Sequence, residues 1–322
     1  MVRRLFVFAA LLAGLLQSDI AAQAQPYPSK PIKLVVGFAP GGGTDTIARI
    51  TAEFLQKRLG QAVVVENRPG AASAIATDYV AKSAPDGYTL LVGTAELVVL
   101  PAARKNLPYD VTKDFTYIIR PFVQNPLIAV GPSSPYSSTK ELIEGMKKNP
   151  GKVRWGHPGI GGINHIGTVM MESAIGAKGV PISYTGAGPL FLDLAAGNVD
   201  FYTGASHPPA AGLKIIGPIG TRRHPAYPDM PTFEELGYKG ASYDAWFAFV
   251  GPANLPKPVL DKLTTEMQAV FKDPDAIAKF KGALSYVPED NPLMGDAFKA
   301  YVVEQVKVWS DVATRENITV QQ

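Results

Sequence analysis

The run Phe38-Ala-Pro-Gly-Gly-Gly-Thr-Asp45 constrains the fold most, because it joins an apolar, strand-like segment, Lys33–Val36, to a segment with helical spacing. Its three consecutive glycines leave the backbone bare and permit positive φ angles. Thr44 or Asp45 is able to cap the helix that follows, or Asp45 ties the loop. The run therefore predicts a strand–loop–helix corner, the first corner (residues 38–45), whose free amide N–H groups and helix dipole attract an anion.

A second glycine-rich run lies much further along the chain, after the apolar segment Val153–Trp155. It reads Trp155-Gly-His-Pro-Gly-Ile-Gly-Gly-Ile-Asn-His165 and precedes another helical pattern. We call it the second corner (residues 155–165). It predicts the same chemistry as the first, namely backbone donors at a helix start that are available to an anion.

The composition restricts the class of protein. The chain has 322 residues, of which 46% are hydrophobic and 18% charged, as in an ordinary globular protein large enough for two domains. A net charge of +3 without a Lys/Arg-rich stripe argues against nucleic acid as a partner. Cysteine is absent, and the four histidines lack metal-ligand spacing, so neither a metal nor a cofactor is predicted.

The N-terminus has the pattern of an export signal. Arg3 and Arg4 form a basic start, residues 5–16 are an apolar run too short to span a bilayer, and Ala22-Gln-Ala24 fits a cleavage site. We therefore predict a signal peptide over residues 1–24 and a mature protein free in the periplasm. Two anion-binding corners in an exported chain indicate a small-molecule receptor more than an enzyme.

Strand-like and helical patterns alternate from residue 30 onward, which is typical of parallel α/β sheets. After Pro252 the alternation stops and the pattern is helical only. The expected strands are 33–36, 63–65, 90–92, 127–130, 153–155, 180–184, 199–202, 215–216 and 246–250, and the helices between them include 47–59, 165–175 and 190–196.

These elements predict an α/β protein of two lobes, each with a doubly wound, mostly parallel sheet. Residues 25–125 and 245–322 would form the first lobe, and residues 126–244 the second. Ligands bind beyond the carboxyl ends of parallel strands, where both corners lie, so the cleft between the lobes is the predicted site. Trp155, Tyr184 and Tyr202 end strands of the second lobe; they either face this cleft or pack in the core.

Several short motifs, in this order, resemble the TctC-like, or Bug-type, extracytoplasmic solute receptors of tripartite tricarboxylate transporters. The resemblance covers nearly all of the predicted mature sequence. The motifs are Tyr27-Pro-Ser-Lys-Pro-Ile32, the first corner with Ala48-Arg49, Val65-Glu-Asn-Arg-Pro-Gly70, Pro85-Asp-Gly-Tyr-Thr-Leu-Leu91, Tyr109-Asp110, Asp114-Phe115, Gly159-x-Gly with His165, Tyr184-x-Gly, and Tyr227-Pro-Asp-Met-Pro-Thr232.

The resemblance implies a monomeric, type II-like periplasmic-binding-protein fold that holds a small organic carboxylate and delivers it to the permease subunits of a tripartite tricarboxylate transporter. It implies that the ligand meets both corner loops, partly through backbone amides and water. The predicted ligand-binding residues are Gly42, Gly43, Thr44, Asp45, Thr94, Ala95, Trp155, Gly161, Asn164, His165, Tyr184, Gly186 and Ser206.

The sequence departs from the family pattern at one wall of the predicted cleft. Relatives usually carry a hydroxyl residue where Gly162 stands and often a basic residue at Thr185, and the segment after Asp200 is shorter than usual. These departures leave the identity of the ligand open: it is a dicarboxylate, a tricarboxylate or an aromatic acid.

Two alternatives to a transport receptor remain. One is a secreted α/β enzyme acting on a small organic acid, although Ser206-His207 lacks the Gly-x-Ser-x-Gly elbow of a serine hydrolase, and the first corner fits neither a Walker nor a Rossmann motif. The other is a ligand sensor for a membrane histidine kinase, which the sequence does not distinguish from a transport receptor.

Overall fold

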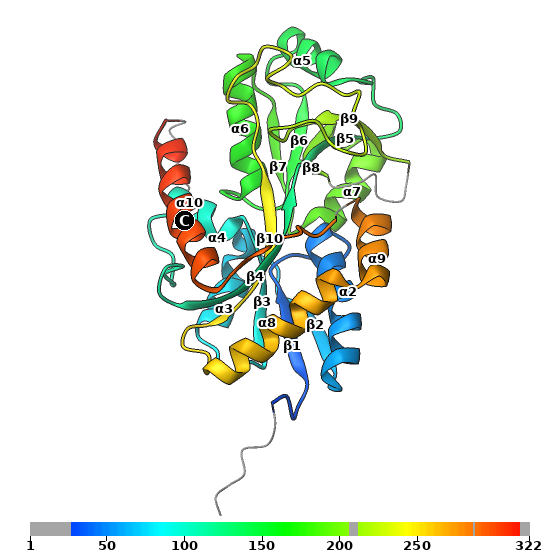
Figure 1. The fold of residues 1–322 in the computed structure, drawn as a ribbon. Helices are drawn as coiled ribbons and strands as arrows, with labels where there is room; N and C mark the ends of the chain where they lie inside the picture. The colour runs from blue at the N-terminus through cyan, green and yellow to red at the C-terminus, as the bar shows by residue number, and fades with distance from the viewer. Residues whose placement is uncertain (1–26, 206–211, 286, 316–322) are drawn as a thin grey trace, which may run out of the picture.

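The structure is a computed structural model that describes residues 27–205, 212–285 and 287–315. The predicted signal peptide, residues 1–24, and Ser206 lie outside these residues. Two α/β lobes are stacked on one another, each built around its own sheet (Figure 1). None of the helices in the described part of the chain is both long and apolar enough to cross a membrane.

The first lobe contains a six-stranded sheet in the order β11-β4-β10-β3-β1-β2. As predicted, β1 pairs in parallel with β2 and β3, whereas β10 pairs antiparallel with β3 and β4. The sheet combines parallel and antiparallel pairs because β4 carries the chain out of the first lobe, whereas β10 brings it back in the opposite direction. The strands are β1 (Ile32–Val36), β2 (Val63–Asn67), β3 (Thr89–Thr94), β4 (Phe115–Gln124), β10 (Ala245–Pro252) and β11 (Leu293–Met294).

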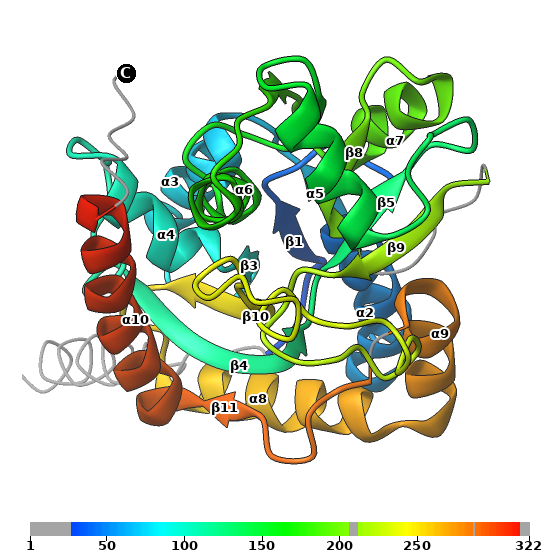
Figure 2. The same ribbon diagram turned by 90° about the horizontal axis from the view of Figure 1, so that it is seen from above.

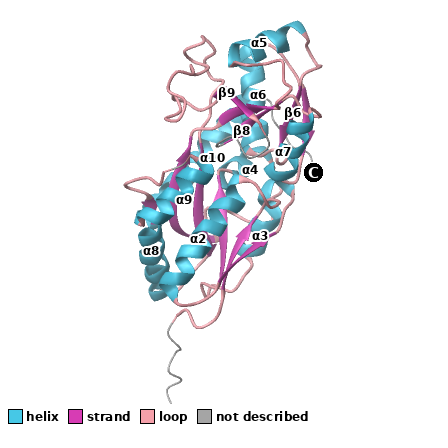
Figure 3. Ribbon diagram, turned by 90° about the vertical axis from the view of Figure 1, so that its right-hand side faces the viewer, coloured by secondary structure: helices cyan, strands magenta, loops and turns pink. Residues whose placement is uncertain are grey.

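Helices cover both faces of this sheet because its strands are apolar on both sides. Leu34 and Val36 join the core beneath α2, α8 and α9, whereas Val35 between them joins the core beneath α3, α4 and α10. Figure 3 shows α8 and α9 on one side of the sheet and α3 on the other. The helices are α2 (Gly43–Leu59), η1 (Ala71–Ser73), α3 (Ala74–Ala81), α4 (Glu96–Ala103), α8 (Lys257–Lys272), α9 (Pro274–Leu284) and α10 (Gly295–Arg315).

The second lobe contains a five-stranded sheet in the order β7-β6-β8-β5-β9. β6 pairs in parallel with β7 and β8, but β5 pairs antiparallel with β8 and β9. Leu142 of α5 and Ile166 of α6 join the core on one face, and Leu190 of α7 joins the core on the other. The elements are β5 (Leu127–Val130), α5 (Thr139–Lys148), β6 (Arg154–His157), α6 (Ile163–Ile175), β7 (Val180–Ser183), α7 (Ala187–Ala196), β8 (Phe201–Ala205) and β9 (Lys214–Pro218).

The two-lobed α/β fold is thus confirmed, with mixed rather than mostly parallel sheets. The chain passes into the second lobe between β4 and β5 and returns between β9 and β10. The exact lobe boundaries remain a prediction. Seen from above, α10 lies beside α4 at one edge of the molecule (Figure 2). We call β4 and β10 the crossing strands, because they lead the chain from one lobe to the other. The cleft between the lobes is formed where these strands and both corners meet.

Candidate ligand-binding pocket

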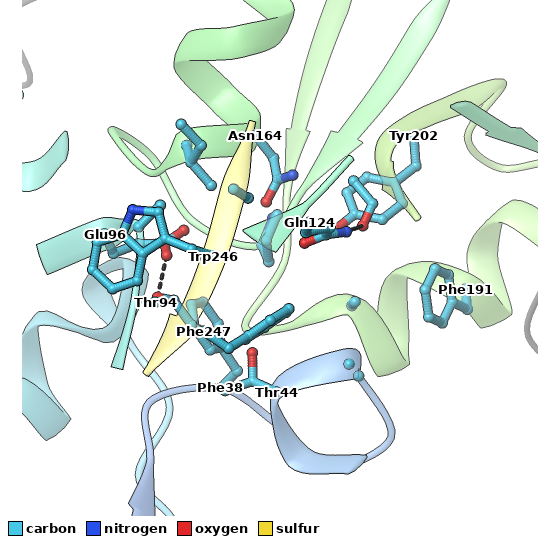
Figure 4. Close-up of a pocket in the computed structure, with 18 residues that line it drawn as sticks. Phe38, Thr44, Thr94, Glu96, Gln124, Asn164, Phe191, Tyr202, Trp246 and Phe247 are labelled. Carbon is cyan, nitrogen blue, oxygen red and sulfur yellow. Dashed lines mark hydrogen bonds between the residues drawn. The ribbon is translucent and has the colours of Figure 1, made fainter. Parts of the chain in front are cut away.

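A pocket lies between the two lobes, with about 610 Å³ of empty space including its mouth. Both corners, the start of α7 and the crossing strands β4 and β10 contribute to it (Figure 4). Its lining consists of Phe38, Gly42, Gly43, Thr44, Thr94, Ala95, Glu96, Gln124, Pro158, Ile163, Asn164, Ala187, Phe191, Tyr202, Gly204, Ala245, Trp246 and Phe247.

The first corner presents its helix start to this pocket. Helix α2 begins at Gly43, and the preceding residue, Gly42, has no side chain to cap it. The first N–H groups of a helix have no partner inside the helix, so they are available to a bound anion. The Thr44 hydroxyl points into the pocket beside them (Figure 4). These donors match the first corner that the sequence predicts.

Asp45 holds the first corner in shape and does not line the pocket. Its carboxylate accepts hydrogen bonds from the Gly41 N–H (3.1 Å), from the Arg49 guanidinium (2.9 and 3.0 Å) and from Asn67 Nδ2 (2.9 Å). Asn67 Nδ2 also donates to the carbonyl of Phe38 (3.0 Å). Burial alone would raise the pKa of Asp45, but these donors outweigh burial and lower it. Neither Thr44 nor Asp45 caps α2. Of the two roles expected of Asp45, capping the helix or tying the loop, the structure shows the second.

The second corner is held by two imidazole rings. The Gly159 N–H donates to Nδ1 of His157 (3.3 Å), and the Gly161 N–H donates to Nδ1 of His165 (3.4 Å). Burial lowers the pKa of both rings, that of His157 to about 4, with a smaller contribution from the neighbouring His165. Both rings are therefore neutral at pH 7, and neutral Nδ1 is able to accept these bonds. Helix α6 begins after Gly162, again without a side-chain cap.

Glu96, the first residue of α4, is a pocket residue that the sequence analysis missed. It is 5% exposed and is the one charged side chain among the lining residues that the structure describes. The Thr94 hydroxyl donates to its Oε2, and its Oε1 lies against the start of α6, 3.2 Å from where a Cβ on Gly162 would stand. Burial raises its pKa, and the Thr94 hydroxyl and nearby backbone N–H groups oppose that rise. Gly162 belongs to the second lobe, so this carboxylate lies at the contact between the lobes.

Two amides supply the remaining polar wall. Nε2 of Gln124 donates to the carbonyl of Gly204 (3.4 Å), and Nδ2 of Asn164 donates to the Tyr243 hydroxyl (3.1 Å). Gly204 has no room for a side chain, because a Cβ there would lie 2.1 Å from Nδ2 of Asn164. Tight packing therefore fixes the orientation of this wall before any ligand arrives.

Aromatic rings form much of the rest of the pocket. Of the aromatic residues that the sequence predicts near the cleft, Tyr202 lines it, with its ring 5.8 Å from that of Phe191. Trp246 and Phe247 of β10 were missed, because their strand reads as an ordinary apolar run. Aromatic faces suit a flat or apolar ligand body. The lining rings are those of Phe38, Phe191, Tyr202, Trp246 and Phe247.

The structure brings six predicted residues into the lining and leaves others outside it. Trp155 is buried, with Nε1 donating to Glu172 (2.8 Å), because its strand packs under α6. The Tyr184 hydroxyl donates to Asp193 (2.7 Å), and Tyr184 borders a separate outer groove. Asp45, Gly161, His165 and Gly186 shape the loops around the pocket without lining it. The predicted residues in the lining are Gly42, Gly43, Thr44, Thr94, Ala95 and Asn164, and their contact with ligand stays a prediction.

The lobes touch along one rim of the cleft. The Ala39 N–H donates to the carbonyl of Thr185 (3.2 Å), and Arg104 donates to the carbonyl of Ile160 (2.9 Å). Glycines permit this approach: a Cβ on Gly188 would lie 2.2 Å from the carbonyl oxygen of Pro40. The two lobes are therefore in direct contact along this rim.

Two α/β lobes that close over a pocket define the class of periplasmic binding proteins. The family model for the tripartite tricarboxylate transporter family receptor, TctC, matches residues 47–308, and the chain belongs to this family, as its motifs predict. It is 34% identical over 304 residues to a UPF0065 protein of Bordetella pertussis, covering 91% of this chain and 92% of the relative.

Solved structures agree with this assignment. The structure of the periplasmic binding protein BugD is 33% identical and superimposes with a TM-score of 0.86, covering 92% of this chain and 100% of BugD. The structure of Rpa4515 from R. palustris with adipate is 28% identical, with a TM-score of 0.84 over 91% of this chain and 99% of that one.

Proposed function

We propose that this protein is a periplasmic receptor that captures a small organic carboxylate between its lobes and delivers it to the membrane permease of a tripartite tricarboxylate transporter. The observation that carries the proposal is the uncapped start of α2, which opens into the pocket between the lobes. Family membership and the adipate-bound neighbour support the ligand class.

Neutral donors suffice for this task. A carboxylate that accepts two or three backbone N–H bonds remains ionised without an arginine clamp. Gly42, Gly43 and Thr44 place such donors on the first lobe, while Asn164 and Tyr202 line the pocket from the second. A ligand that contacts both lobes favours the closed arrangement by the difference in its affinity for the closed and open forms. The permease would then recognise the closed form.

A thermal-shift screen of aliphatic and aromatic mono-, di- and tricarboxylates tests the proposal. A specific ligand at a hundred times its dissociation constant adds about 2.7 kcal/mol to the free energy of unfolding. Mass spectrometry of the same incubations should recover the acid unchanged, whereas a new product would favour the enzyme alternative.

The G43V variant then tests the site itself. We expect at least tenfold weaker binding by calorimetry, about 1.4 kcal/mol, because the branched side chain obstructs the helix start. G282V in α9 is the matched control, since a Cβ there meets nothing within 4 Å. Unchanged affinity in G43V would contradict binding at the first corner.

A further inference from the structure

The two corners differ in what faces them. The start of α2 opens into the pocket, but the start of α6 already faces a carboxylate, that of Glu96. A Cβ on Gly162, which precedes α6, would lie 3.2 Å from Oε1 of Glu96. The protein therefore supplies its own carboxylate at the place where a second anionic group of the ligand would find backbone donors.

No cation neutralises Glu96 within the described ranges. It forms no ion pair there, and none of the lining residues they contain is Lys, Arg or His. The titratable side chains that interact electrostatically with it are Tyr109 and Tyr243, and burial raises the pKa of both, so they stay neutral. Glu96 thus brings to the pocket a carboxylate that has hydrogen-bond donors beside it but no cationic partner among the described residues.

A second carboxylate brought beside ionised Glu96 meets an unfavourable environment. The Thr94 hydroxyl and the start of α6 stabilise the ionised form of Glu96, and two like charges in a poorly solvated site repel strongly. A ligand group that donates a hydrogen bond meets no such penalty. A carboxylate has about four lone-pair sites, and hydrogen bonds to a charged group are the stronger ones.

We infer that Glu96 determines specificity: it excludes ligands with a carboxylate at both ends and selects an acid whose other end is an uncharged hydrogen-bond donor, such as an amide or a hydroxyl group. The single carboxylate of that ligand binds at the first corner, and the rings of Trp246, Phe247 and Phe38 contact its body. This inference rests on the proposed function and narrows its ligand class.

Matched ligand pairs test the inference by calorimetry. One pair is adipate and its monoamide; the other is benzene-1,4-dicarboxylate and its monoamide, so the members of each pair differ only in one terminal group. In the wild-type protein we expect the monoamide of at least one pair to bind at least tenfold more tightly than the dicarboxylate. In E96Q, which removes the charge and keeps the shape, we expect this ratio to fall at least tenfold.

E172Q is the matched control, because Glu172 is also buried and lies outside the pocket, where it accepts from Trp155 and from the Gly179 N–H. In E172Q the ratio of monoamide affinity to dicarboxylate affinity should equal that of the wild-type protein. Wild-type binding of dicarboxylates as tight as that of monoamides would overturn the inference without any variant. A ratio that E96Q leaves unchanged would also overturn it, while carboxylate capture would stand. Failure of every acid, monocarboxylates included, to bind the wild-type protein would overturn both the inference and the proposed function.

Discussion

The two glycine-rich corners look alike in sequence, yet different chemistry holds them. In the first corner an ionised aspartate, Asp45, gathers the Gly41 N–H, Arg49 and Asn67. In the second, neutral His157 and His165 accept backbone N–H groups through their ring nitrogens. Similar loops thus rest on an ion pair in one lobe and on uncharged imidazoles in the other.

The corners also differ in what their helix starts face. Donors at the start of α2 remain open to the pocket, whereas those at the start of α6 meet Glu96 from the opposite lobe. The motif creates the donors, but a side chain from a distant segment decides whether a ligand reaches them.

The largest expected effect comes from preventing the first corner from meeting α7. In G188A the new Cβ would lie 2.2 Å from the carbonyl oxygen of Pro40 when the lobes are closed. We expect at least a hundredfold loss of affinity for the best acid of the screen, about 2.7 kcal/mol, by calorimetry. The free energy of unfolding of the unliganded protein should not decrease, because alanine in a helix is more favourable than glycine by about 1 kcal/mol.

G282A is the reference for this variant, because it makes the same change in helix α9 where a Cβ meets nothing within 4 Å. Its affinity should equal that of the wild-type protein. Small-angle scattering gives a second readout, since ligand should contract the wild-type protein and not G188A. Full affinity in G188A would show that ligand binding does not require this contact between the lobes.

The second expected effect is a difference in acid stability between the corners. The pKa of His157 is about 4 in the folded protein and 6.5 in the unfolded chain, so the unfolded chain binds more protons between these pH values. The free energy of unfolding should therefore fall by roughly 2.5 kcal/mol as the pH drops from 6.5 to 4. Asp45 has a lowered pKa, so its contribution persists above pH 3.8 and is lost only in stronger acid.

H157N tests this difference, because asparagine keeps an acceptor near the Gly159 N–H and does not titrate. Urea unfolding between pH 4 and 7 should show a flatter pH dependence in H157N than in the wild-type protein. Hydrogen exchange should locate the acid-sensitive opening in α6 and its loop. If amide protection in acid were lost first around α2, His157 would not be the cause of the loss of stability in acid.

Much of the fold was predictable because local patterns carry it. The strand at 33–36, the helix ending before Gly60 and the strand at 127–130 are all found in the structure. β4 was missed because Arg120 and Pro121, although buried, interrupt its apolar run, and because a strand buried on both faces shows no alternation. α4 was missed because Pro101 lies inside it, and proline is usually read as the end of a helix.

The pocket was predictable only where a motif forms it. Gly42, Gly43 and Asn164 lie in the corner motifs, and the structure places them in the lining. Gln124 and Trp246 lie on crossing strands that meet the corners only in the folded chain, so no spacing in the sequence points to them. Glu96 directly follows Thr94 and Ala95, which are predicted site residues at the end of a strand. Extending that predicted segment by one residue would have included Glu96.

A smaller effect is expected from the hydroxyl group at the first corner. T44V removes a donor that points into the pocket and preserves the shape of the side chain. A hydrogen bond to a charged group contributes about 1.5 kcal/mol, so we expect roughly tenfold weaker binding of the acid by calorimetry. Affinity within twofold of the wild-type value would mean that the backbone donors alone hold the carboxylate.

The smallest effect should appear at Thr51, two turns further along the same helix. Its hydroxyl is fully buried, and Oγ1 has no hydrogen-bond partner among the residues that the structure describes. T51V makes the same substitution as T44V, so it should leave affinity unchanged and raise the free energy of unfolding by about 1 kcal/mol, because a buried unsatisfied polar group is removed. Urea unfolding measures the gain. Weaker binding in T44V together with unchanged binding in T51V would locate the binding function of α2 in its first turn. A loss of affinity in both variants would instead indicate that they act through the helix as a whole.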